Sequence, residues 1–201
     1  METTSETMPA AFFDALYQQD VDPWNFESSD YEARKYDETL AALPRQRYRN
    51  AFELGCSIGV LTKRLAERCD SLLAVDCSPL ALERAIARCS GLDNVRFERM
   101  NVPREYPRDA SFDLILLSEI AYYWSRPDLK RVFERVVEQL RVGGHVLLVH
   151  WAPPGPDKPL TGAEVHRAFL EWADGRLLHR LGRHEGPYWI DLFERSPMLQ
   201  A

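Results

Sequence analysis

Glycines and acidic residues between positions 53 and 76 form a pattern that can hold a nucleoside. Glu53 and Gly55 end a short apolar run, Gly59 follows, and Asp76 lies about 20 residues beyond Gly55. A glycine lets a ligand approach the backbone because it has no Cβ. A carboxylate at the end of the next strand can bind both hydroxyls of a ribose. The spacing therefore predicts a nucleoside-binding strand–helix–strand unit.

The charge around these glycines indicates which kind of nucleoside is bound. A pyrophosphate cofactor needs the pattern G-x-G-x-x-G and a helix N-terminus that faces its phosphates. This chain lacks the third glycine and carries Glu53 just before Gly55. That carboxylate would repel phosphate but suits a cofactor with an ammonium or sulfonium group. The motif therefore favours S-adenosyl-L-methionine over a dinucleotide.

The elements that must position these residues alternate along the chain. We expect strands at 50–54, 71–75, 95–99, 112–117, 146–149, 179–183 and 188–193, and helices at 59–68, 79–89, 128–140 and 161–173. Such alternation predicts an α/β fold: a doubly wound, Rossmann-like, mostly parallel sheet of these seven strands with helices on both faces. The last two strands have no helix between them, so the C-terminal strand is expected to be antiparallel. Ligands bind at the carboxyl ends of such strands.

Composition restricts the partners and the compartment. The chain has 201 residues, a net charge of -6 and no long basic run, which argues against a nucleic-acid partner. The N-terminus lacks an apolar core, and no apolar run approaches membrane-spanning length. We therefore expect a cytoplasmic monomer or homodimer that does not bind membranes.

The four cysteines are expected to be reduced. Cys56, Cys69, Cys77 and Cys89 form no C-x-x-C pair, and no histidine lies at metal-ligand spacing from them. The sequence thus predicts free thiols and no metal.

Several segments resemble motifs of the class I S-adenosylmethionine-dependent methyltransferases, and they follow in the same order along the chain. Residues 53–59 look like motif I of that class, Asp76 like its ribose-binding acid, and Asn101 and Val102 like its adenine-edge segment. Residues 112–119 resemble the fourth-strand motif, and 140–145 resemble the L-x-P-G-G turn with Val142 in place of proline.

Two N-terminal segments narrow the resemblance. Residues 22–26 and 31–36 are similar to the nodulation methyltransferase S (NodS-like) group. This resemblance implies N-methylation of an amine, such as the amino sugar of an oligosaccharide, with S-adenosyl-L-homocysteine as the other product. Two alternatives remain open: an O-methyltransferase acting on a small hydroxylated metabolite, and a non-catalytic module that binds S-adenosylmethionine. Because the sulfonium methyl is already electrophilic, the transfer needs no metal.

We expect the chain to consist of four parts. Residues 1–10 are expected to be disordered, and 196–201 form a C-terminal tail. Residues 11–44 form a helical cap over the cofactor, with helices at 11–19 and 31–43 and Ser29 or Asp30 capping the second. Residues 45–195 form the methyltransferase domain.

The cofactor-binding residues follow from these motifs. They are expected to be Trp24, Arg34, Glu53, Gly55, Cys56, Ser57, Gly59, Asp76, Cys77, Asn101, Val102 and Ser118. Arg34 could hold the cofactor carboxylate through two parallel hydrogen bonds. Ser57 replaces the central glycine of the usual motif, so we expect it to avoid positive φ and to place its hydroxyl near that carboxylate. Ser78 is expected to cap the following helix and leave Asp76 free.

The acceptor side is predicted to follow the fourth and fifth strands. Glu119, His150 and Tyr122 are the candidate catalytic residues, with Glu119 or His150 taking a proton from the amine. Tyr123, Trp124 and Trp151 are expected to bind the acceptor, because aromatic faces attract cations. The proline-rich loop 152–159 is expected to wall this site. The other four histidines receive no chemical role.

Overall fold

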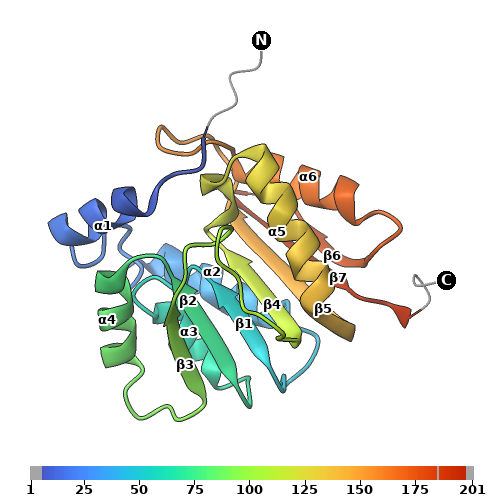
Figure 1. The fold of residues 1–201 in the computed structure, drawn as a ribbon, viewed down its shortest axis with the longest axis horizontal. Coiled ribbons are helices and arrows are strands. Elements are labelled where there is room, and N and C mark those ends of the chain that lie inside the picture. Colours follow the sequence, from blue (N-terminus) through green and yellow to red (C-terminus); the bar gives the residue numbers. More distant parts are fainter. Residues whose placement is uncertain (1–5, 185, 198–201) are drawn as a thin grey trace.

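A seven-stranded sheet forms the centre of the molecule (Figure 1). The computed structural model describes residues 6–184 and 186–197. The strands are β1 (Ala51–Leu54), β2 (Leu72–Asp76), β3 (Val95–Arg99), β4 (Phe112–Ser118), β5 (Leu140–Trp151), β6 (Leu178–Arg183) and β7 (Tyr188–Glu194). They are arranged in the order β3-β2-β1-β4-β5-β7-β6, and β7 is antiparallel to both of its neighbours. The predicted mostly parallel, doubly wound sheet is confirmed.

Helices cover both faces of this sheet. One face packs against α5 (Arg126–Gln139) and α6 (Gly162–Ala173), the other against α2 (Asp30–Ala41), α3 (Val60–Ala66) and α4 (Pro79–Arg88). Along β4, Ile115 and Leu117 belong to the first core, whereas Leu114 and Leu116 belong to the second. This alternation follows from the period of two along a strand. A central parallel strand buried on both faces must be apolar throughout, which β4 nearly is.

The carboxyl ends of β1, β2, β4 and β5 meet at one edge of the sheet. The strand order reverses at this point, because β1 lies between β2 and β4. Open α/β sheets bind ligands in the crevice outside such a reversal. The fold thus brings residues far apart in sequence to a shared edge.

The diglycine segment differs from its predicted role. We expected a turn between a helix ending at 140 and a strand beginning at 146. Instead α5 ends at Gln139, and β5 runs through Gly143, which has φ +74°. The register with β4 shifts between the pairs Phe112–Leu140 and Leu114–His145, so the glycines form an irregularity inside the strand.

The N-terminal segment is more ordered than predicted. Met8 N–H donates to the Tyr123 carbonyl at 2.9 Å, and Thr7 Oγ1 accepts from Ser125 N–H at 2.8 Å. The expectation of disorder is therefore wrong for residues 6–10, while 1–5 lie outside the described residues, as do 198–201 of the predicted tail.

The first helix, α1 (Ala10–Gln19), precedes α2 in the chain. Ser29, one of the two predicted caps, caps α2 by accepting from Glu32 N–H.

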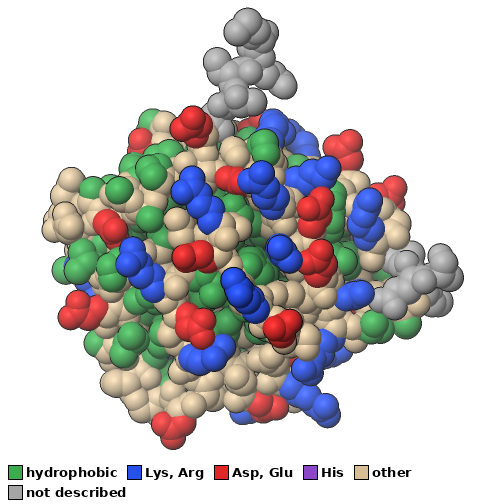
Figure 2. Space-filling model, in the orientation of Figure 1, with side chains coloured by type: hydrophobic (Ala, Val, Ile, Leu, Met, Phe, Trp, Pro, Cys, Tyr) green, Lys and Arg blue, Asp and Glu red, His purple; other side chains and the backbone are tan. Residues whose placement is uncertain are grey.

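The surface carries mixed charge on the face shown in Figure 2, where acidic and basic side chains are interspersed.

Within residues 6–184 and 186–197, no helix combines the length and apolar character needed to cross a bilayer.

Gly59 begins α3 and touches α4 closely. Its φ is +79°, and a Cβ there would lie 2.9 Å from the Ala85 Cα. We expect Gly59→Ala to lower the free energy of unfolding by about 2 kcal/mol or more, because it adds a backbone clash to the cost of a left-handed conformation. Urea denaturation measures this loss. Gly91→Ala is the matched control, since Gly91 has φ +90° but nothing within 4 Å of its Cβ position. Equal losses in both variants would contradict the packing argument.

Candidate functional site

A cavity of about 380 Å³ opens at the carboxyl edge of the sheet. Most of the predicted site residues line it: Trp24, Glu53, Gly55, Cys56, Ser57, Asp76, Cys77, Asn101, Val102, Ser118, Glu119, Tyr122, Tyr123, Trp124 and Trp151. Arg34, Gly59 and His150 do not line it. The sheet edge forms its floor, and α1, α2 and the segment between them contribute further walls.

Asp76 ends β2 and holds the loop that follows β1. Its Oδ2 accepts from Ser57 N–H and its Oδ1 from Ser78 N–H, each at 2.9 Å. The Ser78 hydroxyl makes no capping bond, so the predicted side-chain cap is wrong. Burial raises the pKa of Asp76, and the backbone donors oppose that rise. Each oxygen still has a lone pair for a further donor such as a ribose hydroxyl.

Ser57 adopts the conformation that we expected it to avoid. Its φ is +52°, in the left-handed region. Two hydrogen bonds hold it there: its N–H donates to Asp76, and its Oγ lies 2.5 Å from the Tyr17 hydroxyl of α1. These contacts offset a backbone cost of about 1 kcal/mol. The hydroxyl thus joins the loop to the N-terminal helix.

Glu53 is a buried carboxylate with an unsatisfied oxygen. Within the described part of the chain, its Oε2 has no hydrogen-bond partner. Burial raises the pKa of Glu53 to about 7, and the nearby Asp76 carboxylate adds to the rise. A buried acceptor at the wall of a cavity is suited to a cationic donor from a ligand.

This raised pKa gives a pH dependence with a defined sign. Between the unfolded value of 4.5 and about 7, the folded chain binds the Glu53 proton more tightly than the unfolded chain does. The free energy of unfolding should therefore fall as pH rises through that window. Binding of a cationic ligand needs the ionised form, so its affinity should rise roughly tenfold from pH 6 to pH 8. Calorimetry with S-adenosyl-L-homocysteine at both pH values tests this, and Glu53→Gln should remove both trends. Trends that persist in that variant would assign them to other groups.

The cation at the N-terminal wall is Lys35, not Arg34. Arg34 is exposed and lies off the cavity, so its predicted contact with the cofactor is wrong. Lys35 is 1% exposed, and its Nζ contacts Glu32 Oε1 at 2.9 Å and Glu119 Oε1 at 2.8 Å. The buried face of α2 repeats at helical spacing through Glu32, Lys35, Tyr36 and Thr39. The spacing of these residues can be read from the sequence, and it could have identified Lys35 as the buried cation of this helix.

Glu119 follows β4 and joins three parts of the site. It has φ +54°, and its Oε1 accepts from Lys35 and, at 3.0 Å, from Trp151 N–H. Its Oε2 accepts from the Tyr122 hydroxyl. An uncommon backbone conformation at a cavity wall is typical of functional sites. The carboxylate is therefore already occupied by donors, which fits orientation better than proton removal.

His150 lies behind the cavity wall. It is fully buried, and its Nε2 accepts from Ala121 N–H at 3.1 Å. Burial lowers the pKa of His150 well below its usual value, with His166 adding to the effect. The predicted role as proton acceptor is wrong, because an imidazole that does not reach the cavity cannot contact an acceptor there. Instead it supports η1 (Ala121–Tyr123) from behind.

An aromatic pocket on the β5 side of the cavity holds an internal cation. Lys158 Nζ lies 3.9 Å from the Tyr122 ring centroid and 4.4 Å from that of Trp151. Burial lowers the pKa of Lys158, and the Glu119 carboxylate opposes that effect. Lys158 belongs to the proline-rich loop and lines the cavity, in line with the predicted wall. The loop was identified from its position after the strand, but nothing in its composition singled out this lysine.

The N-terminal wall is also aromatic. Trp24 packs edge-on against Tyr17 at 5.6 Å and stacks on Phe26 at 5.5 Å. Tyr17 was not anticipated as a site residue, because it lies on α1 before any recognisable motif. Contact with Ser57 is what brings it to the loop.

All four cysteines are free, as predicted, and Cys77 is the most exposed of them.

Comparisons with known proteins identify the family. The model of the family Nodulation protein S (NodS) matches residues 14–150. Nodulation protein S of Rhizobium tropici is 27% identical over 63% of this chain and 53% of its own length. The corresponding protein of Bradyrhizobium diazoefficiens is 32% identical over 51% of this chain and 49% of its own length. The chain thus spans about half the length of these curated relatives.

Solved structures show the same fold. A putative methyltransferase from Pseudomonas syringae is 38% identical, with a TM-score of 0.72 over 82% of this chain and 99% of that one. N-methyltransferase NodS from Bradyrhizobium japonicum WM9, solved with S-adenosyl-l-homocysteine, gives a TM-score of 0.76 at 21% identity, over 92% of this chain and 100% of that one. The matched segment includes the glycine loop, Asp76, Glu119 and the aromatic residues after β4, and the chain belongs to the nodulation protein S (NodS) family.

Proposed function

We propose that this chain is an S-adenosyl-L-methionine-dependent methyltransferase that methylates an amine. The observation that carries the proposal is the pairing of two environments in the same cavity. One contains Asp76 and the unsatisfied Glu53 carboxylate; the other contains aromatic rings and Glu119 around the Lys158 ammonium.

The first environment suits the methyl donor. Asp76 has lone pairs for two ribose hydroxyls, and Glu53 provides an acceptor for the ammonium of the methionyl part. Gly55 has φ +73°, and a Cβ there would lie 2.5 Å from Ile120 Cδ1, so a side chain at this position would displace the end of Ile120. Met100 and Val102 give an apolar wall for adenine. When bound, the donor supplies an electrophilic sulfonium methyl.

The second environment suits a cationic or aminated acceptor. Two aromatic faces already hold the Lys158 ammonium, and Glu119 lies close enough to affect its ionisation. An acceptor amine of similar charge would be attracted to the same rings. Alignment of the amine with the methyl group can lower the barrier by roughly 7–11 kcal/mol.

The surroundings of the two predicted bases favour an amine over a hydroxyl acceptor. Among the candidate bases, Glu119 is occupied by Lys35, Tyr122 and Trp151, and His150 is buried away from the cavity. An amine that binds as a cation first loses one proton to water, then attacks with its lone pair and loses a second proton to water, whereas a hydroxyl needs a base during attack. This arrangement supports N-methylation over O-methylation.

The relatives indicate the kind of acceptor. The N-methyltransferase named among the solved structures supports an amine acceptor, and the resemblance to the NodS-like group implies an amino sugar of an oligosaccharide. Small amines remain a second class, because relatives of one fold use different acceptors.

Transfer of a labelled methyl group tests the proposal. We expect incorporation from S-adenosyl-L-methionine into de-N-acetylated amino-sugar oligomers and none into their N-acetylated counterparts, which keep the hydroxyls but lack the basic amine. Incorporation into both would favour an O-methyltransferase. Binding of S-adenosyl-L-homocysteine without transfer to any amine or hydroxyl acceptor would favour a non-catalytic binding module.

A further inference from the structure

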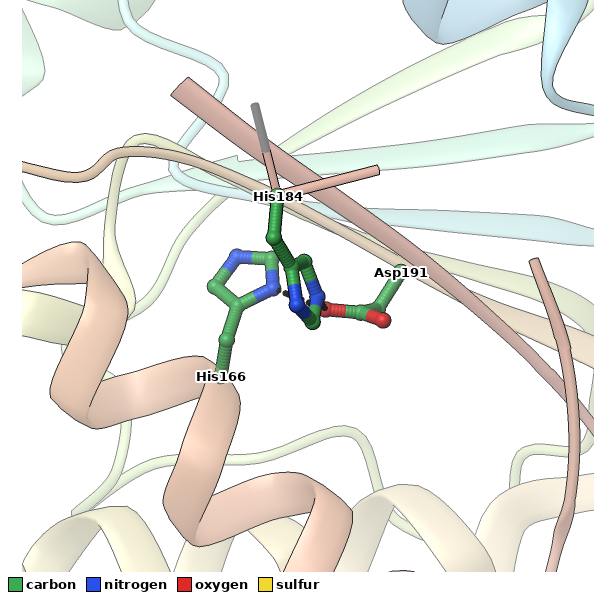
Figure 3. Close-up of side chains that lie close together, drawn as sticks. All are labelled: His166, His184 and Asp191. Carbon is green, nitrogen blue, oxygen red and sulfur yellow. Dashed lines mark hydrogen bonds and ion pairs between the residues drawn. The ribbon is translucent and has the colours of Figure 1, made fainter. Parts of the chain in front are cut away.

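Three of the five histidines of the chain bond one buried carboxylate outside the cavity, and a fourth, His150 of β5, bonds one of those three. Asp191 on β7 is fully buried, and its partners are His166 of α6, His179 of β6 and His184 just after β6. Figure 3 shows the His166 and His184 rings converging on Asp191 from different elements. None of these side chains has a role in the proposed methyl transfer.

The distances bring ligand atoms together. Asp191 Oδ2 lies 2.5 Å from His166 Nδ1 and 2.7 Å from His184 Nε2, and the three ligand atoms all lie within 4.8 Å of one another. Asp191 Oδ1 lies 2.6 Å from His179 Nε2. We propose that His166, His184 and Asp191 form a binding site for a zinc-class divalent transition metal ion.

The chemistry of the donors favours that class of ion. Imidazole nitrogens suit zinc and its neighbours, whereas calcium and magnesium need sets of oxygen ligands. Every side chain that the described residues place in hydrogen bonding with the Asp191 carboxylate is an imidazole. His166 is fully buried, which gives a rigid ligand, while the His184 side chain is 34% exposed and gives an entry path. His179 bonds the second carboxylate oxygen and would orient it.

The fold explains what such an ion would do. The three ligands come from α6, β7 and the segment after β6, so one ion would fasten the C-terminal hairpin to the helix that covers β5. The ion would therefore stabilise this edge of the sheet without contacting the cavity.

Metal binding would rearrange a chain of hydrogen bonds that begins at His166. Ala121 N–H donates to His150 Nε2, so neutral His150 donates from Nδ1 to His166 Nε2, and His166 donates from Nδ1 to Asp191. Coordination at His166 Nδ1 moves the remaining proton to Nε2. His150 Nδ1 must then accept a hydrogen bond from His166 Nε2–H, so the His150 proton moves to its own Nε2. As a result, Ala121 N–H loses the nitrogen that accepts its hydrogen bond. Metal binding at His166 would therefore change the hydrogen bonding of η1, the segment that carries Tyr122.

Zinc titration of the chelator-stripped full chain tests the site. We expect about one Zn²⁺ per chain by calorimetry, a higher melting temperature, and no binding of Ca²⁺. His184→Ala removes an accessible ligand and should weaken zinc binding at least tenfold, as should Asp191→Asn. Arg183→Ala, an exposed neighbour of His184, is the matched control and should bind zinc as the wild type does.

Three results would overturn the proposal. The first is no zinc binding by the wild type, and the second is zinc binding of wild-type affinity in a folded His184→Ala protein. The third is a histidine ¹⁵N spectrum in which the His166 and His150 nitrogens do not change on zinc addition. Binding of S-adenosyl-L-homocysteine is measured separately, so failure of the metal site and failure of the methyltransferase proposal are distinguishable.

Discussion

Asp76→Ala should weaken binding of S-adenosyl-L-homocysteine about 100-fold or more. The carboxylate already accepts from Ser57 and Ser78 N–H and lies beside Cys77, and its oxygens can accept further hydrogen bonds from a ligand. Hydrogen bonds to a charged group contribute about 1.5–3 kcal/mol each, and two of them would bind the ribose. The substitution also releases the loop N–H groups, which adds to the loss. Isothermal titration calorimetry measures the affinity directly.

Two further variants make this result specific. Asp93→Ala removes an exposed acid just before β3, at the opposite edge of the sheet, and should leave affinity unchanged. Asp76→Asn keeps the shape of the side chain but removes its charge, so an intermediate loss of roughly tenfold is expected. Unchanged affinity in a folded Asp76→Ala protein would rule out the proposed cofactor site.

Lys35→Met should destabilise the protein by about 3 kcal/mol or more. The substitution keeps an apolar stem in the helix but leaves the carboxylates of Glu32 and Glu119 without their shared cation. Those side chains are 10% and 12% exposed, so little water is available to replace the ammonium. Removing one partner of a buried ion pair typically costs about 3–5 kcal/mol. Urea denaturation at pH 7 measures the change.

The adjacent residue provides the control. Arg34→Met alters an exposed side chain on the same helix and should change stability by less than about 0.5 kcal/mol. The double variant Lys35→Met with Glu119→Gln should recover part of the loss, because the uncompensated charge is removed. If Arg34→Met proved as damaging as Lys35→Met, the burial of Lys35 would not be the cause.

The predicted site residues that line the cavity lie at fixed distances from strand ends. Gly55, Asp76 and Glu119 could be placed at this edge because a parallel sheet brings every strand's carboxyl end to the same side. The assignments that were wrong depended on the direction of a side chain. Arg34 and Lys35 are neighbours in sequence, yet a helix turns by about 100° per residue, so one is exposed while the other is buried.

The backbone conformation of Ser57, in the loop after β1, also could not be predicted from local sequence. The usual preference of serine argued against positive φ at Ser57, and the preference was overridden by contacts with Tyr17 and Asp76. Tyr17 lies 40 residues away in the chain. No local pattern contains that contact.

By itself the sequence determined the alternation of strands and helices, the ligand edge and the family, since periodicity and motif spacing are local properties of the chain. Only the tertiary structure decided which charges are buried together: Lys35 with Glu119 at the cavity, and the histidines with Asp191 behind it. His166, His179 and His184 follow no ligand spacing, because α6, β6 and the segment after β6 supply them separately. A buried charge requires compensating partners wherever the packing supplies them, and packing brings together residues that no local pattern connects.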